Sequence, residues 1–290
     1  MSAAPAVSQE GPLALICGGG SLPLAVADRA AARGRKVLLF PLRGVADSVG
    51  IERYPHHWMY LGQVAKLMRL ARAANCRDLV FIGSLVRPSL WRVRFDFKTL
   101  LMLPRIVAAF RGGDDHLLSS IARLFEQEGF RLLGAHEVAP EILVPEGALG
   151  RVQISDRDRA DVALGFDYLH AAGPFDVGQA VVVAGKHVLA VEAAEGTDAM
   201  LARVVEMRAN GRVRSAVGSG VLVKAPKHGQ DRRFDLPSIG PQTVEEVARA
   251  GLAGIAVVAG STIIAEPERL IAVADRAGIF VLGAPAGTAR

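Results

Sequence analysis

The sequence has 290 residues, more than one compact core usually needs and enough for two domains of ordinary length. Its hydrophobic fraction of 51% and its 31 glycines are typical of an α/β protein with buried parallel strands, whereas 6% aromatic residues argues against stacking on nucleic-acid bases. The net charge of +5 favours anionic partners, and the two cysteines, Cys17 and Cys76, stand among apolar residues as expected for reduced thiols in a cytoplasm.

Residues 1–12 are predicted to form a disordered leader, because they lack the basic and apolar stretches of a secretory signal. The next 126 or so residues alternate between strand and helix patterns. Strands are expected at 13–17, 36–41, 78–83 and 130–133, and helices at 22–33, 63–74, 97–110 and 114–128. This alternation predicts a Rossmann-like N-terminal domain, residues 13–138, built on a parallel sheet.

The second half has a different pattern. Pro140 and Pro145, with nearby glycines, mark a linker over residues 139–150. Strands at 180–183 and 187–191 flank a short turn and predict a hairpin, while strands at 255–258 and 279–282 enclose a helix at 267–277. We therefore expect a C-terminal catalytic domain over residues 151–290 with a mixed α/β fold. No stretch of about 18 residues lacks charge, which argues against a membrane-spanning helix.

A glycine-rich loop follows the first strand, and the next segment is helical. Glycines here would let a phosphate approach the helix N-terminus, so Gly19, Gly20 and Ser21 are candidate nucleotide contacts, with a plain tight turn as the alternative. The dinucleotide fingerprint would need a glycine where Pro23 stands, and no ribose-binding acid follows the second strand, so a redox enzyme is a weaker interpretation.

Other candidates follow further strands and helices. Gly83, Ser84 and Arg87 stand where the third parallel strand ends, a common place for ligands, although a polar loop would look the same. Asp114 and Asp115 begin a helix, where one of them is expected to act only as a cap. The stretch 87–111 interleaves six basic residues with apolar ones, which suits a membrane surface or an acylated anionic ligand; a core helix with a basic face is the alternative. Nucleic acid is not an expected partner.

The densest chemistry lies between Lys224 and Asp235, where cationic and acidic residues crowd together as suits a phosphate ester and a metal ion; a solvated charged loop is the alternative. Glu195, Gly196 and Thr197 form a second polar turn. The spacing of Asp231 and Asp235 separates their Cα atoms by about 13 Å along a strand or roughly 6 Å along a helix or turn, so they could share an ion only in the second case. The seven histidines are scattered and form no zinc ligand set.

Taken together, these motifs resemble a known family. The opening 15–23, the step 112–115, the turn 195–198 and the run 227–240 are similar to the UDP-2,3-diacylglucosamine pyrophosphatases of the lipid A pathway, of the LpxI type. The similarity covers nearly the whole chain after the leader. Cys17 stands where an alanine is common in the glycine loop.

The resemblance implies a cytoplasmic, Mg²⁺-dependent hydrolase peripheral to the inner membrane, which cleaves its acylated UDP-sugar to UMP and lipid X as water attacks a phosphorus. It places the essential aspartate at Asp231, with Asp235 beside it, and both are expected metal ligands. The expected substrate contacts are Gly19, Gly20, Ser21, Gly83, Ser84, Arg87, Asp114, Asp115, Glu195, Gly196, Thr197, Lys224, Gln230 and Arg232. The alternative from another class is a non-catalytic nucleotide-sugar or lipid-binding protein.

Overall fold

The computed structural model of the protein describes residues 11–84, 114–175, 177–227, 231–234, 236–285 and 287, with side chains of the segment 114–175 described from residue 121. It divides into two compact units. The first comprises the chain up to Pro140 together with the short segment 231–235, and the second comprises the remainder from Glu141. Of the helices in the described ranges, none has the length and apolar character needed to cross a membrane.

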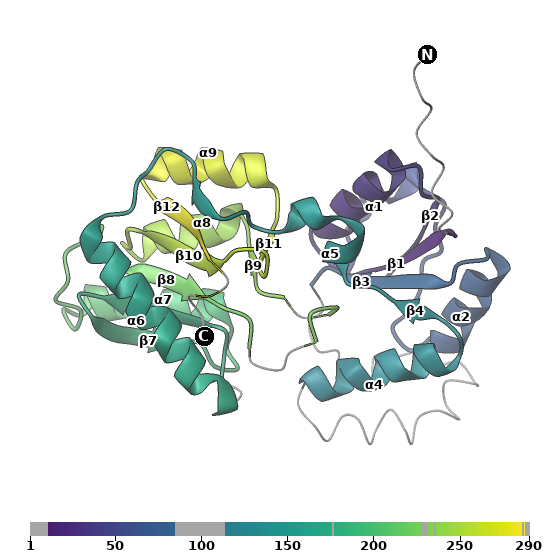
Figure 1. The fold of residues 1–290 in the computed structure, drawn as a ribbon, viewed down its shortest axis with the longest axis horizontal. Coiled ribbons are helices and arrows are strands. Elements are labelled where there is room, and N and C mark those ends of the chain that lie inside the picture. The colour runs from purple at the N-terminus through teal and green to yellow at the C-terminus, as the bar shows by residue number, and fades with distance from the viewer. Residues whose placement is uncertain are drawn as a thin grey trace, which may run out of the picture. The chain divides into compact units, whose positions relative to one another are not determined.

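The first unit is built on a parallel sheet, as predicted, and its strand order is β2-β1-β3-β4. Its strands are β1 (Leu13–Cys17), β2 (Val37–Pro41), β3 (Asp78–Ile82) and β4 (Arg131–Leu132). Its helices are α1 (Leu22–Ala32), α2 (Val64–Ala73), α4 (Asp114–Gln127) and the short α5 (Ala135–Val138), with a 3-10 turn at Ile51–Arg53. Helices α2 and α4 contribute to one core cluster with β1 and β2, while α1 and α5 lie on the opposite face of the sheet (Figure 1).

The second unit holds a mixed six-stranded sheet, again as predicted, with order β5-β12-β10-β8-β6-β7. Strands β8 (Val221–Lys224), β10 (Gly254–Val258) and β12 (Phe280–Ala284) are parallel. The hairpin β6 (Ala180–Ala184) and β7 (His187–Val191), and the edge strand β5 (Gly147–Leu149), pair antiparallel. A separate parallel pair joins β9 (Ser238–Ile239) to β11 (Ile263–Ile264).

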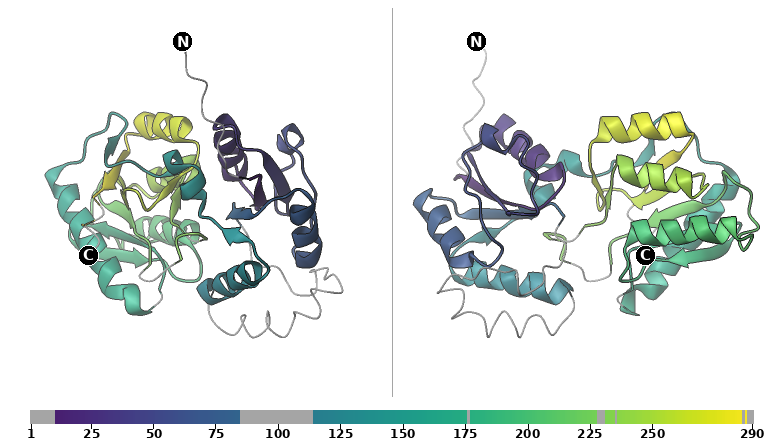
Figure 2. Two further views of the ribbon diagram at one scale, coloured as in Figure 1. Left: turned by 45° about the vertical axis from the view of Figure 1, so that its right-hand side comes forward. Right: turned by 180° about the vertical axis from the view of Figure 1, so that it is seen from behind.

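Helices cover both faces of this mixed sheet. Helices α7 (Thr197–Ala209), α8 (Pro241–Arg249) and α9 (Pro267–Ala277) pack side by side over one core cluster, seen in green to yellow in the right view of Figure 2. Helix α6 (Asp156–Ala172) contributes Val162 and Phe166 to the cluster on the other face. Each sheet is thus buried between helices, as hydrophobic strand runs require.

Two features differ from the domain limits expected from sequence. Strand β5 and a 3-10 turn at Pro140–Ile142 occupy the range 139–150, which was expected to be a linker. The segment 231–235 groups with the first unit, although the sequence placed it inside a continuous C-terminal domain. Neither feature has a local sequence signal, because a three-residue edge strand is too short for periodicity and a docked turn depends on distant partners. The helix expected at 97–110 lies outside the described residues.

An ion cluster closes the amino-terminal edge of the first sheet. Asp78, the first residue of β3 and 7% exposed, accepts hydrogen bonds from Arg35 and from Nε and Nη2 of Arg131, the latter at 2.7 and 2.8 Å. Burial alone would raise the pKa of Asp78, but the two guanidinium groups outweigh it and hold that pKa below its ordinary value. The carboxylate therefore stays charged between the starts of three strands.

We expect Asp78→Asn to lower the free energy of unfolding of the first unit by about 3 kcal/mol, because removing one partner of a buried ion pair leaves the other charge uncompensated. The guanidinium of Arg35, whose side chain is 5% exposed, would lose this carboxylate. Both tryptophans, Trp58 and Trp91, stand in the first 140 residues, so urea unfolding followed by their fluorescence reports on this unit.

The control is Glu128→Gln, which removes an exposed ion pair with Arg72 and should cost less than about 1 kcal/mol. The contribution of the Asp78 carboxylate to the free energy of unfolding is present above the unfolded carboxyl pKa of about 3.9. It is lost as pH falls through the lower pKa of the folded state. The stability gap between wild type and Asp78→Asn should therefore narrow in acid. Equal stability at neutral pH would contradict the prediction.

Candidate functional site

The loops that follow β1 and β3 meet at the carboxyl-terminal edge of the first sheet. Gly19 and Ser84 exchange backbone hydrogen bonds of 2.8 and 2.9 Å, and the Gly18 N–H donates to Ile82 at 2.8 Å. A Cβ on Gly83, whose φ is +101°, would stand 2.7 Å from the Gly19 carbonyl oxygen. Close approach of two backbones therefore explains why glycines are needed here.

This arrangement limits which amides of the glycine loop can receive a phosphate. The N–H groups of Gly18 and Gly19 already donate within the protein, and the Gly20 N–H donates to Asp47 Oδ2 at 3.3 Å. Ser21 directly precedes α1, and its carbonyl accepts the N–H of Ala25. The strand, loop and helix arrangement expected from the sequence is present, while phosphate binding by this loop stays a prediction.

The charged segment near residue 231 forms a turn docked on the first unit. The Phe234 N–H donates to the Asp231 carbonyl at 3.1 Å, and the Arg233 N–H donates to Asp231 Oδ1 at 3.0 Å. The guanidinium of Arg233 returns to the same carboxylate, with Nε 3.0 Å from Oδ1 and Nη2 2.7 Å from Oδ2. Asp231 thus closes its own turn, which is one of the two arrangements that the sequence left open. The spacing to Asp235 stays a prediction, because Asp235 lies outside the described residues.

Contacts with three elements of the first unit fix where this turn lies. Arg233 Nη1 donates to Glu126 Oε1 of α4 at 2.6 Å, and the ring of Phe234 meets Phe81 of β3 edge-on with centroids 5.9 Å apart. The Cα of Arg233 packs so closely on Gly134, just after β4, that a Cβ on this glycine would come within 3.3 Å of it. Asp231 and the glycine loop therefore occupy the carboxyl-terminal edge of the same sheet, where α/β proteins commonly bind ligands.

The charge state of Asp231 follows from its partner. Hydrogen bonds from Arg233 are the main reason that the pKa of Asp231 lies below its ordinary value, with burial opposing them. Its side chain is 27% exposed, so an ionised carboxylate is accessible to water. Such a group can accept a proton, hold a water molecule or bind a hard cation.

The donor chemistry can be tested against magnesium. Within the described ranges, no three His, Cys, Asp or Glu side chains gather in a way that could hold a metal ion. Mg²⁺, however, is commonly held by one or two carboxylates together with phosphate oxygens of the substrate rather than by a protein cage. Asp231 supplies a carboxylate of that kind, and Asp235, its expected partner, lies outside the described residues.

His136 stands close to the same turn, although the sequence offered no reason to select it. Burial and then the charge of Arg232 lower the pKa of His136 below its ordinary value, against an opposing effect of Glu137. In the part of the chain that the structure describes, its buried Nδ1 has no hydrogen-bond partner. His136 is therefore a neutral imidazole beside Arg232 near pH 7, and only its position after β4 could have suggested it.

The predicted residues of the second unit take part in local structure. Lys224 ends β8, is 5% exposed and donates to the Ser238 carbonyl at 3.0 Å. Glu195 forms an ion pair with Arg203 at 2.9 Å, and the Thr197 hydroxyl donates to Glu192 at 2.7 Å where α7 begins. Gly196 precedes α7 with a φ of +82°, a conformation that suits glycine.

The side chains of several residues predicted to contact the substrate lie outside the described part of the structure. Asp114 and Asp115 begin α4, as expected, and only their backbone is described. Arg87 and Gln230 lie outside the described residues, as does the basic and apolar stretch 87–111.

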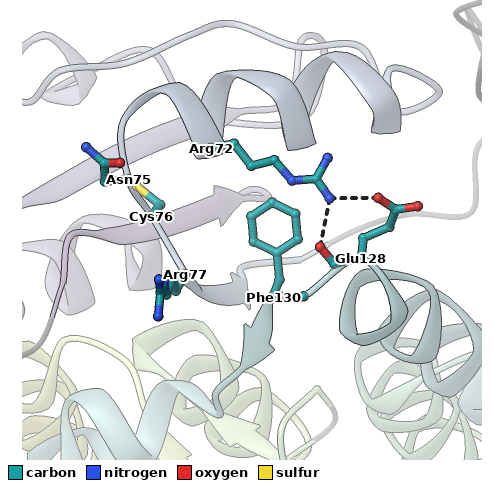
Figure 3. A pocket seen from close by; sticks show the side chains of 7 residues that line it. Arg72, Asn75, Cys76, Arg77, Glu128 and Phe130 are labelled. Carbon is teal, nitrogen blue, oxygen red and sulfur yellow. Dashed lines mark hydrogen bonds and ion pairs between the residues drawn. The ribbon is translucent and has the colours of Figure 1, made fainter.

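A cavity of about 330 Å³ in the first unit is lined by none of the predicted residues whose side chains the structure describes. It opens beside Arg77 and Phe130, which precede β3 and β4, and therefore lies toward the amino-terminal edge of the first sheet. Figure 3 shows Arg72 extending above Phe130 to Glu128, which it contacts at 2.6 Å. The cavity contains neither an apolar wall for acyl chains nor the acidic turn, so it is not the candidate site.

Two family models and a curated relative all point to the same protein family. Residues 12–142 match the family model described as the LpxI N-terminal domain, and residues 145–282 match the LpxI C-terminal domain. The UDP-2,3-diacylglucosamine pyrophosphatase LpxI of Caulobacter vibrioides is 43% identical over 271 residues, which cover 93% of this chain and 96% of that protein.

Two solved structures with which the chain was compared are only distantly similar to it. A UDP-glucose 4-epimerase of Thermus thermophilus in complex with NAD is 17% identical over 94% of this chain and 86% of its own, with a TM-score of 0.30. A GalE-like L-threonine dehydrogenase of Cupriavidus necator is 9% identical over 91% and 88%, with a TM-score of 0.28. Scores this low carry no conclusion, so identity rests on the two matched domains and the Caulobacter relative: the chain belongs to the LpxI family.

Proposed function

We propose that this protein hydrolyses the pyrophosphate bond of UDP-2,3-diacylglucosamine to UMP and 2,3-diacylglucosamine 1-phosphate, lipid X, in lipid A biosynthesis. The observation that carries the proposal is 43% identity over nearly the full length of both chains to a relative with that activity in its name. Both halves of the chain also match domains of that family. The protein is a hydrolase acting on a phosphorus anhydride.

In the proposed mechanism Asp231 activates water. Its ionised carboxylate accepts a proton while the water oxygen bonds to a phosphorus and the bond from that phosphorus to the bridging oxygen breaks. UMP leaves with the bridging oxygen when water attacks the β-phosphorus. Hydrogen bonds from Arg233 hold the pKa of Asp231 below its ordinary value, so the carboxylate is in the ionised form that this role requires.

Cations are needed around the two negative phosphates. Arg232 follows Asp231 directly and is close enough to His136 for its charge to influence that imidazole, so we assign it to the phosphoryl oxygens. Lys224 is a second candidate, from the other unit, although its burial and its bond to Ser238 leave it little exposed. In the glycine loop we assign Ser21, directly before α1, to the nucleotide, because the N–H groups of the three preceding glycines already donate within the protein.

Magnesium belongs to the proposal as well. Asp231, with Asp235 as the expected second ligand, would hold the ion together with substrate phosphates. When bound, Mg²⁺ neutralises charge that develops on the phosphoryl oxygens. The substrate also carries two acyl chains, so we propose a cytoplasmic enzyme that works at the surface of the inner membrane, with the stretch 87–111 as the sequence candidate for apolar and cationic contact.

We expect Asp231→Asn to lower kcat for UMP release by about 100-fold to 10,000-fold, the range ascribed to a positioned general base. Chromatographic detection of UMP from substrate in detergent micelles measures this. The control, Glu128→Gln, removes an acid of the same unit that pairs with Arg72 and should keep wild-type turnover. A folded Asp231→Asn variant with wild-type kcat would rule out Asp231 as the base.

Removal of magnesium should abolish UMP release, and its return after the chelator is exhausted should restore the rate. Full activity in excess chelator would contradict the metal requirement alone. Binding of the acylated UDP-sugar without any release of UMP, with or without Mg²⁺, would instead favour a non-catalytic binding protein.

A further inference from the structure

The chain passes briefly from the second unit into the first at the candidate base, Asp231. Residues on both sides of the segment 231–235 belong to the second unit, while the segment itself belongs to the first. Asp231 is therefore not held in place by a strand or helix of its own. Its position depends on the contacts that residues 231–234 make with the first unit.

Arg233 makes the polar part of that attachment. Its guanidinium lies between two carboxylates, with Nε and Nη2 directed at Asp231 and Nη1 at 2.6 Å from Glu126 of α4. The Arg233 side chain is 32% exposed, and that of Glu126 is 40% exposed. A planar guanidinium can donate hydrogen bonds to both carboxylates at once, whereas a lysine ammonium offers one point charge.

Phe234 makes the apolar part. Its ring packs against the core of the first unit through Phe81, and the Arg233 guanidinium stands 5.4 Å from the centroid of the same ring. The cation and the ring thus brace each other, and Arg233 has little freedom to turn away from the two acids.

We propose that Arg233 is a positioning residue for the pyrophosphatase reaction, which holds the Asp231 carboxylate at the edge of the first sheet through its bridge to Glu126. The inference rests on the proposed function. Arg233 acts through Asp231 and not on substrate, because its donor groups are already directed at the two carboxylates.

The sharpest test compares two glutamates two residues apart. Glu126 and Glu128 are both 40% exposed, and each accepts from an arginine at 2.6 Å, but only the partner of Glu126 reaches Asp231. We expect Glu126→Gln to lower kcat for UMP release by about tenfold with KM nearly unchanged, since misplacement of a catalytic group acts on the reacting geometry. Glu128→Gln should leave both constants at wild-type values.

Variants of Arg233 extend the test. Arg233→Ala should lower kcat by up to about 100-fold, and Arg233→Lys should recover only a small part because it cannot reproduce the planar guanidinium. Urea unfolding followed by tryptophan fluorescence separates loss of fold from loss of position, and Glu126→Gln provides the milder change where Arg233→Ala does not fold.

The outcomes separate the two proposals. An active wild type whose Glu126→Gln variant keeps the wild-type kcat would overturn the positioning role alone. Equal losses in Glu126→Gln and Glu128→Gln would do the same, because they would show a general effect of charge. A wild type that releases no UMP would overturn both the function and the role of Arg233.

Discussion

Two backbone hydrogen bonds between Gly19 and Ser84 join the loops after β1 and β3, and the carboxyl-terminal edge of the first sheet is organised around them. The loops can approach this closely only because Gly18 and Gly83 carry no side chains. Beside these joined loops, the acidic turn at Asp231 contacts Phe81 of β3, Gly134 after β4 and Glu126 near the end of α4. The backbone of one edge thus brings together residues separated by more than two hundred positions in the chain.

Much of the fold could be predicted because periodicity is a local property. Buried strands such as β1 and β10, the hairpin of β6 and β7, and helix α9 each carry a pattern that needs no knowledge of their neighbours. Helices α6 and α8 begin at residues that commonly start helices: Ser155 caps α6 by accepting from the Asp158 N–H, and Pro241 follows Gly240 where α8 begins.

The site was only partly predictable, for a different physical reason. Charge density and the family resemblance select Asp231 from the sequence. The contacts that place it are non-local: Phe81, Glu126 and Gly134 lie about a hundred positions or more from the turn, and nothing near residue 231 indicates them. In the glycine loop, the sequence pattern predicts phosphate binding, while the structure also shows close packing of two backbones there.

The excursion of the chain at residues 231–235 also bears on how this family can vary. Its two matched domains meet near residue 143, the point at which halves could be exchanged between relatives. The residues that receive the acidic turn, Phe81 and Glu126, lie in one half, whereas Arg233 and Phe234 are encoded in the other. A chimaera joined at this point would combine the acidic turn of one relative with the Phe81 and Glu126 contact surface of another. The two halves are therefore expected to have changed together, as one evolutionary unit in spite of their separate cores.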